Sequence, residues 1–241
     1  MTKFDQHKRG FFRHVGVLGA TLASGSLIQN SHAEPLKASQ LTAEQALQVL
    51  KDGNARFMAD KAEPVIYGKD RRLALARSQT PIAVLVSCSD SRVPPELLFG
   101  RGLGELFIVR NAGNTVDTVA LGSIEYAVAK LGVPLIVVMG HEGCGAVEAA
   151  VNVVEKQAQF PGRIGTMVEP IVPAVLRAKA GLANKKYTAE MLLDASVREN
   201  VKRVVTRLQE TEPMLMEPLR TKKLMVVGAR YDLHDGSVEF F

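Results

Sequence analysis

The chain has 241 residues, of which 46% are hydrophobic, and a formal net charge of +5. That length is enough to bury a large core, and no apolar run reaches the roughly 20 residues that span a bilayer. Residues 1–33 hold +3 of the net charge, the remainder is nearly balanced, and no basic face with interleaved aromatic residues is evident. The sequence therefore predicts neither a nucleic-acid partner nor a membrane anchor.

The N-terminal residues are typical of an export signal. A basic stretch ending at Arg13 precedes a mildly apolar segment, Val15–Ile28, and then the small residues Ser31 and Ala33. This order favours a cleaved secretory signal over residues 1–33, with the cut after Ala33. A single domain over 34–241 would remain. The alternatives are a disordered basic tail or an uncleaved anchor.

The basic stretch also resembles a twin-arginine signal, which directs export to the periplasm. Lys8-Arg9 stands for the arginine pair, Phe11-Phe12 for the apolar pair, and Arg13 for the trailing base. Lys8 departs from the strict pair, so export is better supported than this route. The route carries folded proteins, so cysteine ligands would acquire their metal before they meet an oxidising compartment.

Two helices are expected before the first buried strand. Thr42 is a suitable N-cap, and Gln45 completes a capping box with it. Apolar residues within Ala46–Phe57 recur near helical spacing, so one face of this helix should be packed. A second helix is expected over Arg71–Arg77.

Apolar runs with polar flanks predict strands that are buried on both faces, as in a parallel sheet covered by helices. Helical patterns alternate with these runs, and a turn over Tyr231–Ser237 precedes a last edge strand. The sequence therefore predicts an α/β fold: a mainly parallel sheet flanked by helices, with an antiparallel C-terminal edge strand. The expected strands are Ile82–Val86, Leu106–Val109, Pro134–Met139, Lys223–Gly228 and Val238–Phe241, and the further helices are Thr115–Leu131, Thr166–Ala183 and Thr188–Glu210.

Residues with metal-binding side chains follow two of the predicted strands. Cys88 and Asp90 come directly after the first strand, and His141 and Cys144 come after the third. The carboxyl ends of parallel strands are where ligands gather in such sheets. Two thiols, one imidazole and one carboxylate form a credible four-coordinate zinc set.

The segment around Cys144 suits a metal-bound thiolate. Cys144 lies where the next helix begins, and the free N–H groups there stabilise negative charge. Gly140, Gly143 and Gly145 are expected to let the backbone approach the metal without an intervening Cβ.

Other interpretations of these residues remain open. A cysteine at a strand end is usually a small buried hydrophobe, and a histidine beside glycines is usually just hydrogen-bonded. Cys88 and Cys144 could also form a disulfide, although the Asp-x-Arg and His-x-x-Cys spacings would then serve no purpose. His234, in a turn with no cysteine nearby, is not expected to be a ligand.

Three motifs resemble the β-class carbonic anhydrases: Cys-Ser-Asp-Ser-Arg-Val-Pro-Pro-Glu at 88–96, Arg-Asn-Ala-Gly-Asn at 110–114 and His-Glu-Gly-Cys-Gly-Ala at 141–146. Gln79-Thr80-Pro81 and Gly228–Leu233 also fit. The resemblance extends from about residue 42 to the C-terminus. It implies reversible hydration of carbon dioxide to bicarbonate and a proton, by attack of zinc-bound hydroxide, with one zinc ion per chain. It also implies a homodimer or homotetramer.

The resemblance assigns roles to particular residues. Cys88, His141 and Cys144 would bind zinc, and Asp90 would form a dyad with Arg92. In an open site Arg92 keeps Asp90 off the metal, whereas in a closed site Asp90 becomes the fourth ligand. Substrate-binding roles fall to Gln79, which would hydrogen-bond the substrate, to Gly145, whose N–H would contact bicarbonate, and to Ala112 and Tyr126, which would line an apolar carbon dioxide pocket.

Two rival functions are compatible with these motifs. The first is a related hydrolase that acts on carbon disulfide or carbonyl sulfide with the same zinc chemistry. The second is a non-enzymatic protein stabilised by zinc. A structural zinc site has four protein ligands and no use for an Asp–Arg pair, so Arg92 argues against the second rival.

Overall fold

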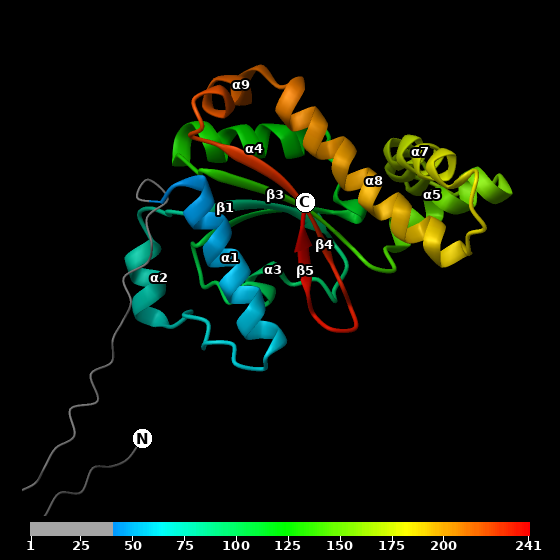
Figure 1. Ribbon diagram of the computed structural model, residues 1–241. Helices are drawn as coiled ribbons and strands as arrows, with labels where there is room; N and C mark the ends of the chain where they lie inside the picture. The colour runs from blue at the N-terminus through cyan, green and yellow to red at the C-terminus, as the bar shows by residue number, and fades with distance from the viewer. Residues whose placement is uncertain (1–40) are drawn as a thin grey trace, which may run out of the picture. The chain divides into compact units, whose positions relative to one another are not determined.

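The apolar runs form one sheet in the computed structural model, which describes residues 41–241. The predicted signal over residues 1–33 lies outside the described residues. The sheet has five strands in the order β2-β1-β3-β4-β5 (Figure 1). They are β1 (Ala83–Cys88), β2 (Leu106–Asn111), β3 (Leu135–His141), β4 (Met225–Tyr231) and β5 (Val238–Phe240).

The sheet is parallel except at its C-terminal edge, as predicted. β1 pairs with β2 and β3 in parallel, and β3 pairs in parallel with β4. β5 runs antiparallel to β4 because a short turn joins the two strands, and a parallel neighbour would need a long crossover. Every residue of β1 and β3 is buried, which explains why both were continuous apolar runs in the sequence.

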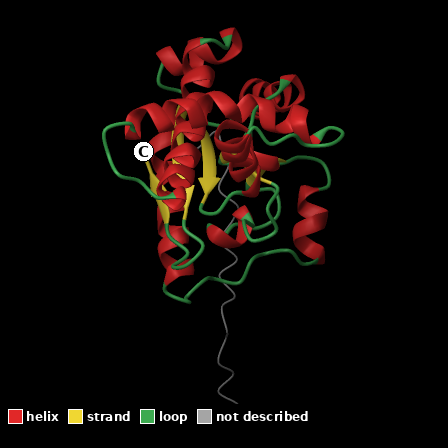
Figure 2. Cartoon of the chain, turned by 90° about the vertical axis from the view of Figure 1, so that its right-hand side faces the viewer, coloured by secondary structure: helices red, strands yellow, loops and turns green. Residues whose placement is uncertain are grey.

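Helices cover both faces of the sheet, as Figures 1 and 2 show. Apolar residues of α4, α8 and α9 pack on one face, against Val84, Val86, Ile136 and Val138. Residues of α1 and α3 pack on the other face, against Leu85 and Val137. None of the helices within residues 41–241 is both long and apolar enough to cross a bilayer. The helices are α1 (Ala43–Met58), α2 (Lys69–Leu75), α3 (Pro95–Leu98), α4 (Thr118–Leu131), α5 (Gly145–Lys156), α6 (Ile164–Val168), α7 (Val172–Leu182), α8 (Ala189–Glu210) and α9 (Pro213–Arg220), with 3-10 turns η2 (Ala112–Asn114) and η3 (Glu169–Ile171).

The capping prediction for the first helix is confirmed, and three other expected helices have different bounds. The helix expected over Arg71–Arg77 is α2, which covers Lys69–Leu75. Thr42 caps α1, and the side chain of Gln45 completes the capping box. α4 begins at Thr118 rather than Thr115, because Asp117 provides the cap by accepting from the N–H of Ala120. The single helix expected over 166–183 is wrong: prolines interrupt the pattern, and the segment divides into α6, η3 and α7.

One glycine sets the contact between α1 and α3. A Cβ on Gly53 would overlap the carbonyl oxygen and carbon of Phe99, which are backbone atoms that cannot turn away. Gly53→Ala should therefore lower the free energy of unfolding by roughly 3 kcal/mol, as measured by urea denaturation.

Gly181 provides the matched control for this substitution, because a Cβ there, in α7, would meet nothing within 4 Å. Gly181→Ala should raise stability by about 0.5 kcal/mol through helix propensity alone. Equal effects of the two substitutions would show that Gly53 does not set the contact.

Candidate metal centre

Three metal-binding side chains meet at the carboxyl ends of two neighbouring strands. Cys88 is the last residue of β1, His141 is the last residue of β3, and Cys144 precedes α5 as its N-cap. Their ligand atoms all lie within 4.8 Å of one another, and all three residues are buried. The structure therefore brings together the three residues that the sequence predicted as zinc ligands.

The distance between the two thiols suits a shared metal ion. Both cysteines are free, and their Sγ atoms lie 3.9 Å apart. A disulfide would need about 2.05 Å. Two sulfurs bound to one tetrahedral zinc at about 2.3 Å would lie about 3.8 Å apart. The disulfide alternative is thus not the arrangement in the structure.

The ring of His141 is oriented for metal binding. Its Nδ1 lies 2.8 Å from the carbonyl oxygen of Glu142, which can only accept, so Nδ1 carries the proton. This tautomer leaves a lone pair on Nε2, a fully buried atom without a hydrogen-bond partner. A buried polar atom of this kind is rare unless something binds it, and a metal ion beside the two thiols would satisfy it.

The thiols themselves favour a cation between them. The neighbouring Cys144 thiol is the main reason that the pKa of Cys88 falls to about 4, and the Gly113 N–H, 3.3 Å from its Sγ, lowers this pKa further. The hydrogen bond that the Cys144 thiol donates to Cys88 raises the pKa of Cys144, and burial and the negative charge on Cys88 raise it further. Both become thiolates only when a positive charge binds them, which is the chemistry of a dication site.

Asp90 is held by Arg92 beside this centre. The Arg92 guanidinium donates through Nε to Oδ1 of Asp90 at 3.0 Å and through Nη2 to Oδ2 at 2.8 Å. This bidentate pair holds the pKa of Asp90 well below its usual range. Asp90 Oδ2 lies 3.8 Å from Nε2 of His141, but Asp90 is not in the group of three ligands. The arrangement is that expected of an open site, and Asp90 as a fourth ligand stays a prediction.

Backbone contacts that the sequence analysis missed fix the segments after β1 and β2. Arg110, in β2, donates to the carbonyl oxygens of Cys88 at 2.8 Å and Asp90 at 2.7 Å. The buried Asn200, in α8, donates to the carbonyl of Gly113 at 2.8 Å. Arg110 lies in the Arg-Asn-Ala-Gly-Asn motif at 110–114, which could have indicated a role for it at the site. Asn200 is one of several polar residues in a long helix, and no sequence pattern distinguishes it from the others.

Of the four predicted substrate-binding residues, two lie beside the centre. Ala112, in η2, packs against the apolar cluster that contains Cys88 and Cys144. Gly145 begins α5 directly after Cys144. Their substrate-binding roles stay predictions.

The other two predicted substrate-binding residues lie elsewhere in the chain. Gln79 is exposed and precedes β1, at the end of that strand opposite Cys88. Tyr126, in α4, is half exposed, and the centroid of its ring lies 6.5 Å from the centroid of the Phe107 ring. Phe107 is four residues before Asn111, the partner of Cys88 in the sheet, so Tyr126 lies well back along β2. Within one chain, the structure does not bring Gln79 or Tyr126 to the thiols.

Two of the glycines around His141 have roles apart from metal approach. A Cβ on Gly140 would lie 2.8 Å from Val197 and 2.9 Å from Val201, so this glycine allows α8 to pack on β3. Gly143 has a φ of +59°, a left-handed turn conformation that favours glycine. The expectation for Gly140 is therefore wrong: the group that approaches this glycine closely is helix α8, and not a metal ion.

The fold and the centre together define an α/β protein with a candidate metal site at the carboxyl ends of the strands. The family model described as carbonic anhydrase matches residues 83–238. A carbonic anhydrase of Mycolicibacterium smegmatis is 41% identical over 195 residues, covering 80% of this chain and 91% of the relative. Carbonic anhydrase 2 of Mycobacterium tuberculosis is 39% identical over 192 residues, covering 79% and 89%. The chain belongs to the β-class carbonic anhydrases, enzymes that use zinc.

Solved structures agree with this assignment. The tetrameric β-carbonic anhydrases of Sordaria macrospora give a TM-score of 0.64 at 27% identity, covering 70% of this chain and 84% of theirs. The Coccomyxa β-carbonic anhydrase gives a TM-score of 0.61 at 27% identity, covering 80% and 85%. The predicted fold class and the prediction of a zinc enzyme are both confirmed, and the non-enzymatic alternative is set aside.

Proposed function

We propose that this protein hydrates carbon dioxide reversibly to bicarbonate and a proton, with one zinc ion held by Cys88, His141 and Cys144. The observation that carries the proposal is the buried group of two thiols and one unpartnered imidazole nitrogen. In the known carbonic anhydrase example with three histidines, zinc lowers the pKa of bound water from 15.7 to about 7 and so supplies a nucleophile at neutral pH.

The protein's own residues would then position the reacting atoms. The Asp90 carboxylate would accept a hydrogen bond from the attacking water or hydroxide and orient it toward carbon dioxide, while Arg92, which holds both carboxylate oxygens, would keep Asp90 away from the metal. Ala112 contributes an apolar wall suited to carbon dioxide. The N–H of Gly145, at the start of α5, is available to a negatively charged product oxygen.

Stopped-flow assays with carbon dioxide, carbonyl sulfide and carbon disulfide test the substrate. The three substrates share the zinc chemistry and differ in how they reach the centre. We expect carbon dioxide hydration to be by far the fastest reaction of the zinc-loaded protein. Rapid hydrolysis of a sulfur-containing substrate without carbon dioxide hydration would favour the rival hydrolase.

A homodimer or homotetramer is part of the proposal. Gln79 and Tyr126 lie away from the thiols of their own chain, so contact with substrate would require the centre of a second copy. Tetrameric relatives support such an assembly. Light scattering should give the mass of a dimer or tetramer, and the mass of one chain would contradict this part.

Export to the periplasm is also proposed, on the basic, apolar and small-residue order of residues 1–33. In a Gram-negative cell the mature protein should begin at Glu34, as N-terminal sequencing would show. Replacing Lys8-Arg9 with Gln-Gln should abolish export, because the twin-arginine pathway requires the basic pair. If that variant still reached the periplasm, the twin-arginine route would be wrong.

A further inference from the structure

Glu142 connects the metal centre to the turn between β4 and β5. Its carbonyl oxygen accepts from Nδ1 of His141 at 2.8 Å. Its own N–H donates to the carbonyl of Tyr231 at 2.9 Å, and its carboxylate Oε2 accepts from the N–H of Leu233 at 3.1 Å. The main-chain N–H of Glu142 is therefore held by β4, and its side-chain carboxylate by the turn.

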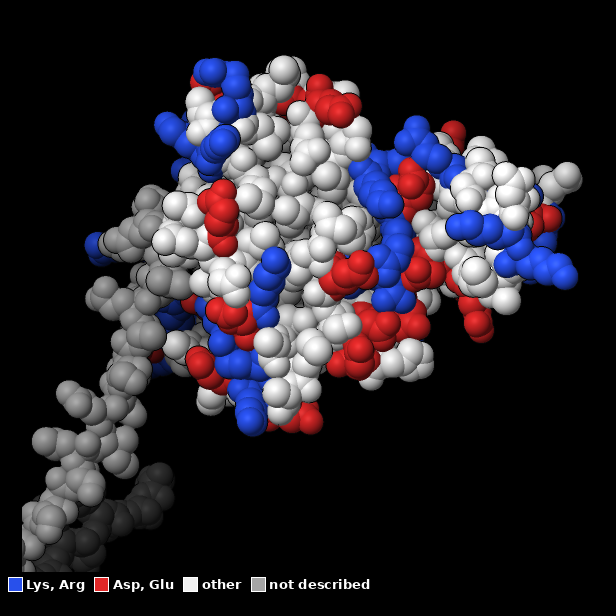
Figure 3. Space-filling model, in the orientation of Figure 1, with Lys and Arg blue, Asp and Glu red and all other residues white. Residues whose placement is uncertain are grey.

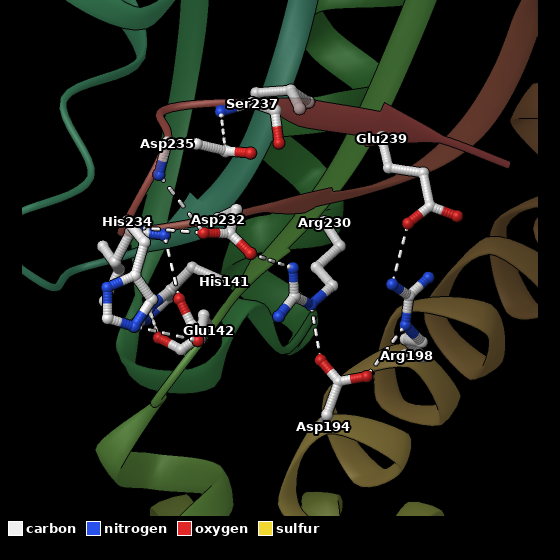
Figure 4. Close-up of polar contacts among 12 residues, drawn as sticks. His141, Glu142, Asp194, Arg198, Arg230, Asp232, His234, Asp235, Ser237 and Glu239 are labelled. Carbon is white, nitrogen blue, oxygen red and sulfur yellow. Dashed lines mark hydrogen bonds and ion pairs between the residues drawn. The ribbon is translucent and has the colours of Figure 1, made fainter. Parts of the chain in front are cut away.

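The turn that receives the Glu142 carboxylate is itself anchored. Asp232 Oδ1 accepts from the N–H of His234 at 2.9 Å, which closes the turn. Asp232 Oδ2 pairs with Arg230 at 3.0 Å, and Arg230 pairs with Asp194 of α8 at 2.5 Å (Figure 4). The Arg230 side chain is only 12% exposed, so water screens these pairs weakly.

A second set of charges ties the same helix to the edge strand. Arg198 of α8 donates to Asp194 at 3.0 Å and to Glu239 of β5 at 2.7 Å. Acidic and basic side chains lie next to one another along this boundary between α8 and the sheet edge (Figure 3). Both arms of the hairpin are thus fixed to α8, and the turn offers the Leu233 N–H in a set position.

This arrangement has a direct consequence for the metal ligand. A metal-binding histidine depends on the acceptor at its other nitrogen, which fixes the tautomer and the ring orientation. For His141 that acceptor is a main-chain carbonyl, whose direction depends on what holds Glu142. The carboxylate of Glu142 is not in the ligand group and has no other role in the proposed mechanism.

We propose that Glu142 is a positioning residue for zinc: its carboxylate docks on the Leu233 N–H and so holds the Glu142 carbonyl against His141. The inference rests on the role of His141 as a zinc ligand in the proposed function. Glu142 acts through His141 and does not contact the metal or the substrate.

Zinc affinity of the full chain, measured by competition with a chromophoric chelator, tests the proposal. Glu142→Ala removes the docked carboxylate and should weaken zinc binding about 10–100-fold, as loss of an outer-shell partner does. Glu142→Gln keeps an oxygen that can accept from Leu233 and should bind zinc nearly as tightly as the wild type. Glu148→Ala removes an equal charge from an exposed position in the first turn of α5 and should have no effect.

Two further readouts separate positioning from general stability. The visible absorption of the cobalt(II)-substituted protein should change in Glu142→Ala and not in Glu142→Gln. The unfolding temperature of the metal-free protein should be similar in the two variants. Asp232→Ala should also weaken zinc binding, and its effect combined with Glu142→Ala should be less than the sum, because both act through one turn.

Unchanged zinc affinity in Glu142→Ala would overturn the inference. So would equal losses in Glu142→Ala, Glu142→Gln and Glu148→Ala, which would indicate a charge effect without docking. These outcomes are distinct from failure of the proposed function, in which His141→Ala would bind zinc as tightly as the wild type.

Discussion

Cys144→Ser and His141→Ala are each expected to lose the bound zinc and, with it, all measurable hydration of carbon dioxide. Each substitution removes one of three buried ligands, so the remaining two cannot hold the ion against dialysis. Zinc affinity depends on the deprotonated ligands, and a serine hydroxyl does not supply the second thiolate. Elemental analysis after dialysis, alongside a stopped-flow assay, measures both effects.

His234→Ala is the matched control for the histidine substitution. His234 is the one other histidine after residue 33, and it is outside the ligand group. Its side chain is 87% exposed, and its Nε2 lies 3.6 Å from Oε1 of Glu142, an exposed pair that contributes little and leaves the Oε2 contact with Leu233 in place. It should retain one zinc ion per chain. Full zinc content in His141→Ala, or loss of zinc in His234→Ala, would contradict the assignment of the ligands.

Arg92→Ala should have the second-largest effect: zinc stays bound while activity falls by roughly 10²-fold or more, the loss seen when one preorganised group beside a reacting oxygen is removed. Without its bidentate partner, the Asp90 carboxylate would be free to bind the zinc and would block access of the reacting water. Asp90→Ala should also keep zinc, because three ligands remain, and should lose activity because the attacking hydroxyl is no longer oriented.

Measurements on both dyad variants and on Arg92→Lys decide this account. A lysine keeps the positive charge but cannot form the bidentate pair, so the activity of Arg92→Lys should lie between those of the wild type and Arg92→Ala. Because Arg92 holds the pKa of Asp90 well below its usual range, Asp90 stays ionised at neutral and mildly acidic pH. Protonation of Asp90 therefore does not account for a change of activity between neutral and mildly acidic pH. Full activity of Arg92→Ala with zinc bound would show that the dyad is not a gate.

The strands were predictable from sequence because they are buried on both faces. Ala83–Cys88 and Leu135–His141 sit between two helical layers, so nearly every position had to be apolar. Their order in the sheet was not predictable, because the runs resemble one another. The break between α6 and α7 was missed because helical apolar spacing continues across Pro170 and Pro173 while the backbone hydrogen bonds do not.

The metal ligands were predictable for a different reason. Few cysteines and histidines follow residue 33, and Cys88 and His141 end parallel strands, whose carboxyl ends meet at one edge. The supporting contacts were hidden, because Glu142 reaches Leu233 and Asn200 reaches Gly113 across 91 and 87 residues of sequence. No local sequence pattern predicts hydrogen bonds between residues so far apart in the chain. The positions of Gln79 and Tyr126 likewise depend on the folded chain.

The central claim is that the centre formed by Cys88, His141 and Cys144 hydrates carbon dioxide with bound zinc. Stopped-flow hydration by one preparation, assayed as purified, after removal of zinc by chelation, and after zinc is restored, tests it most directly. We expect rapid hydration with one zinc ion per chain, loss of activity with the metal, and recovery when zinc returns. Hydration that persists at full rate in the metal-free protein, or its absence in the fully zinc-loaded protein, would contradict the claim.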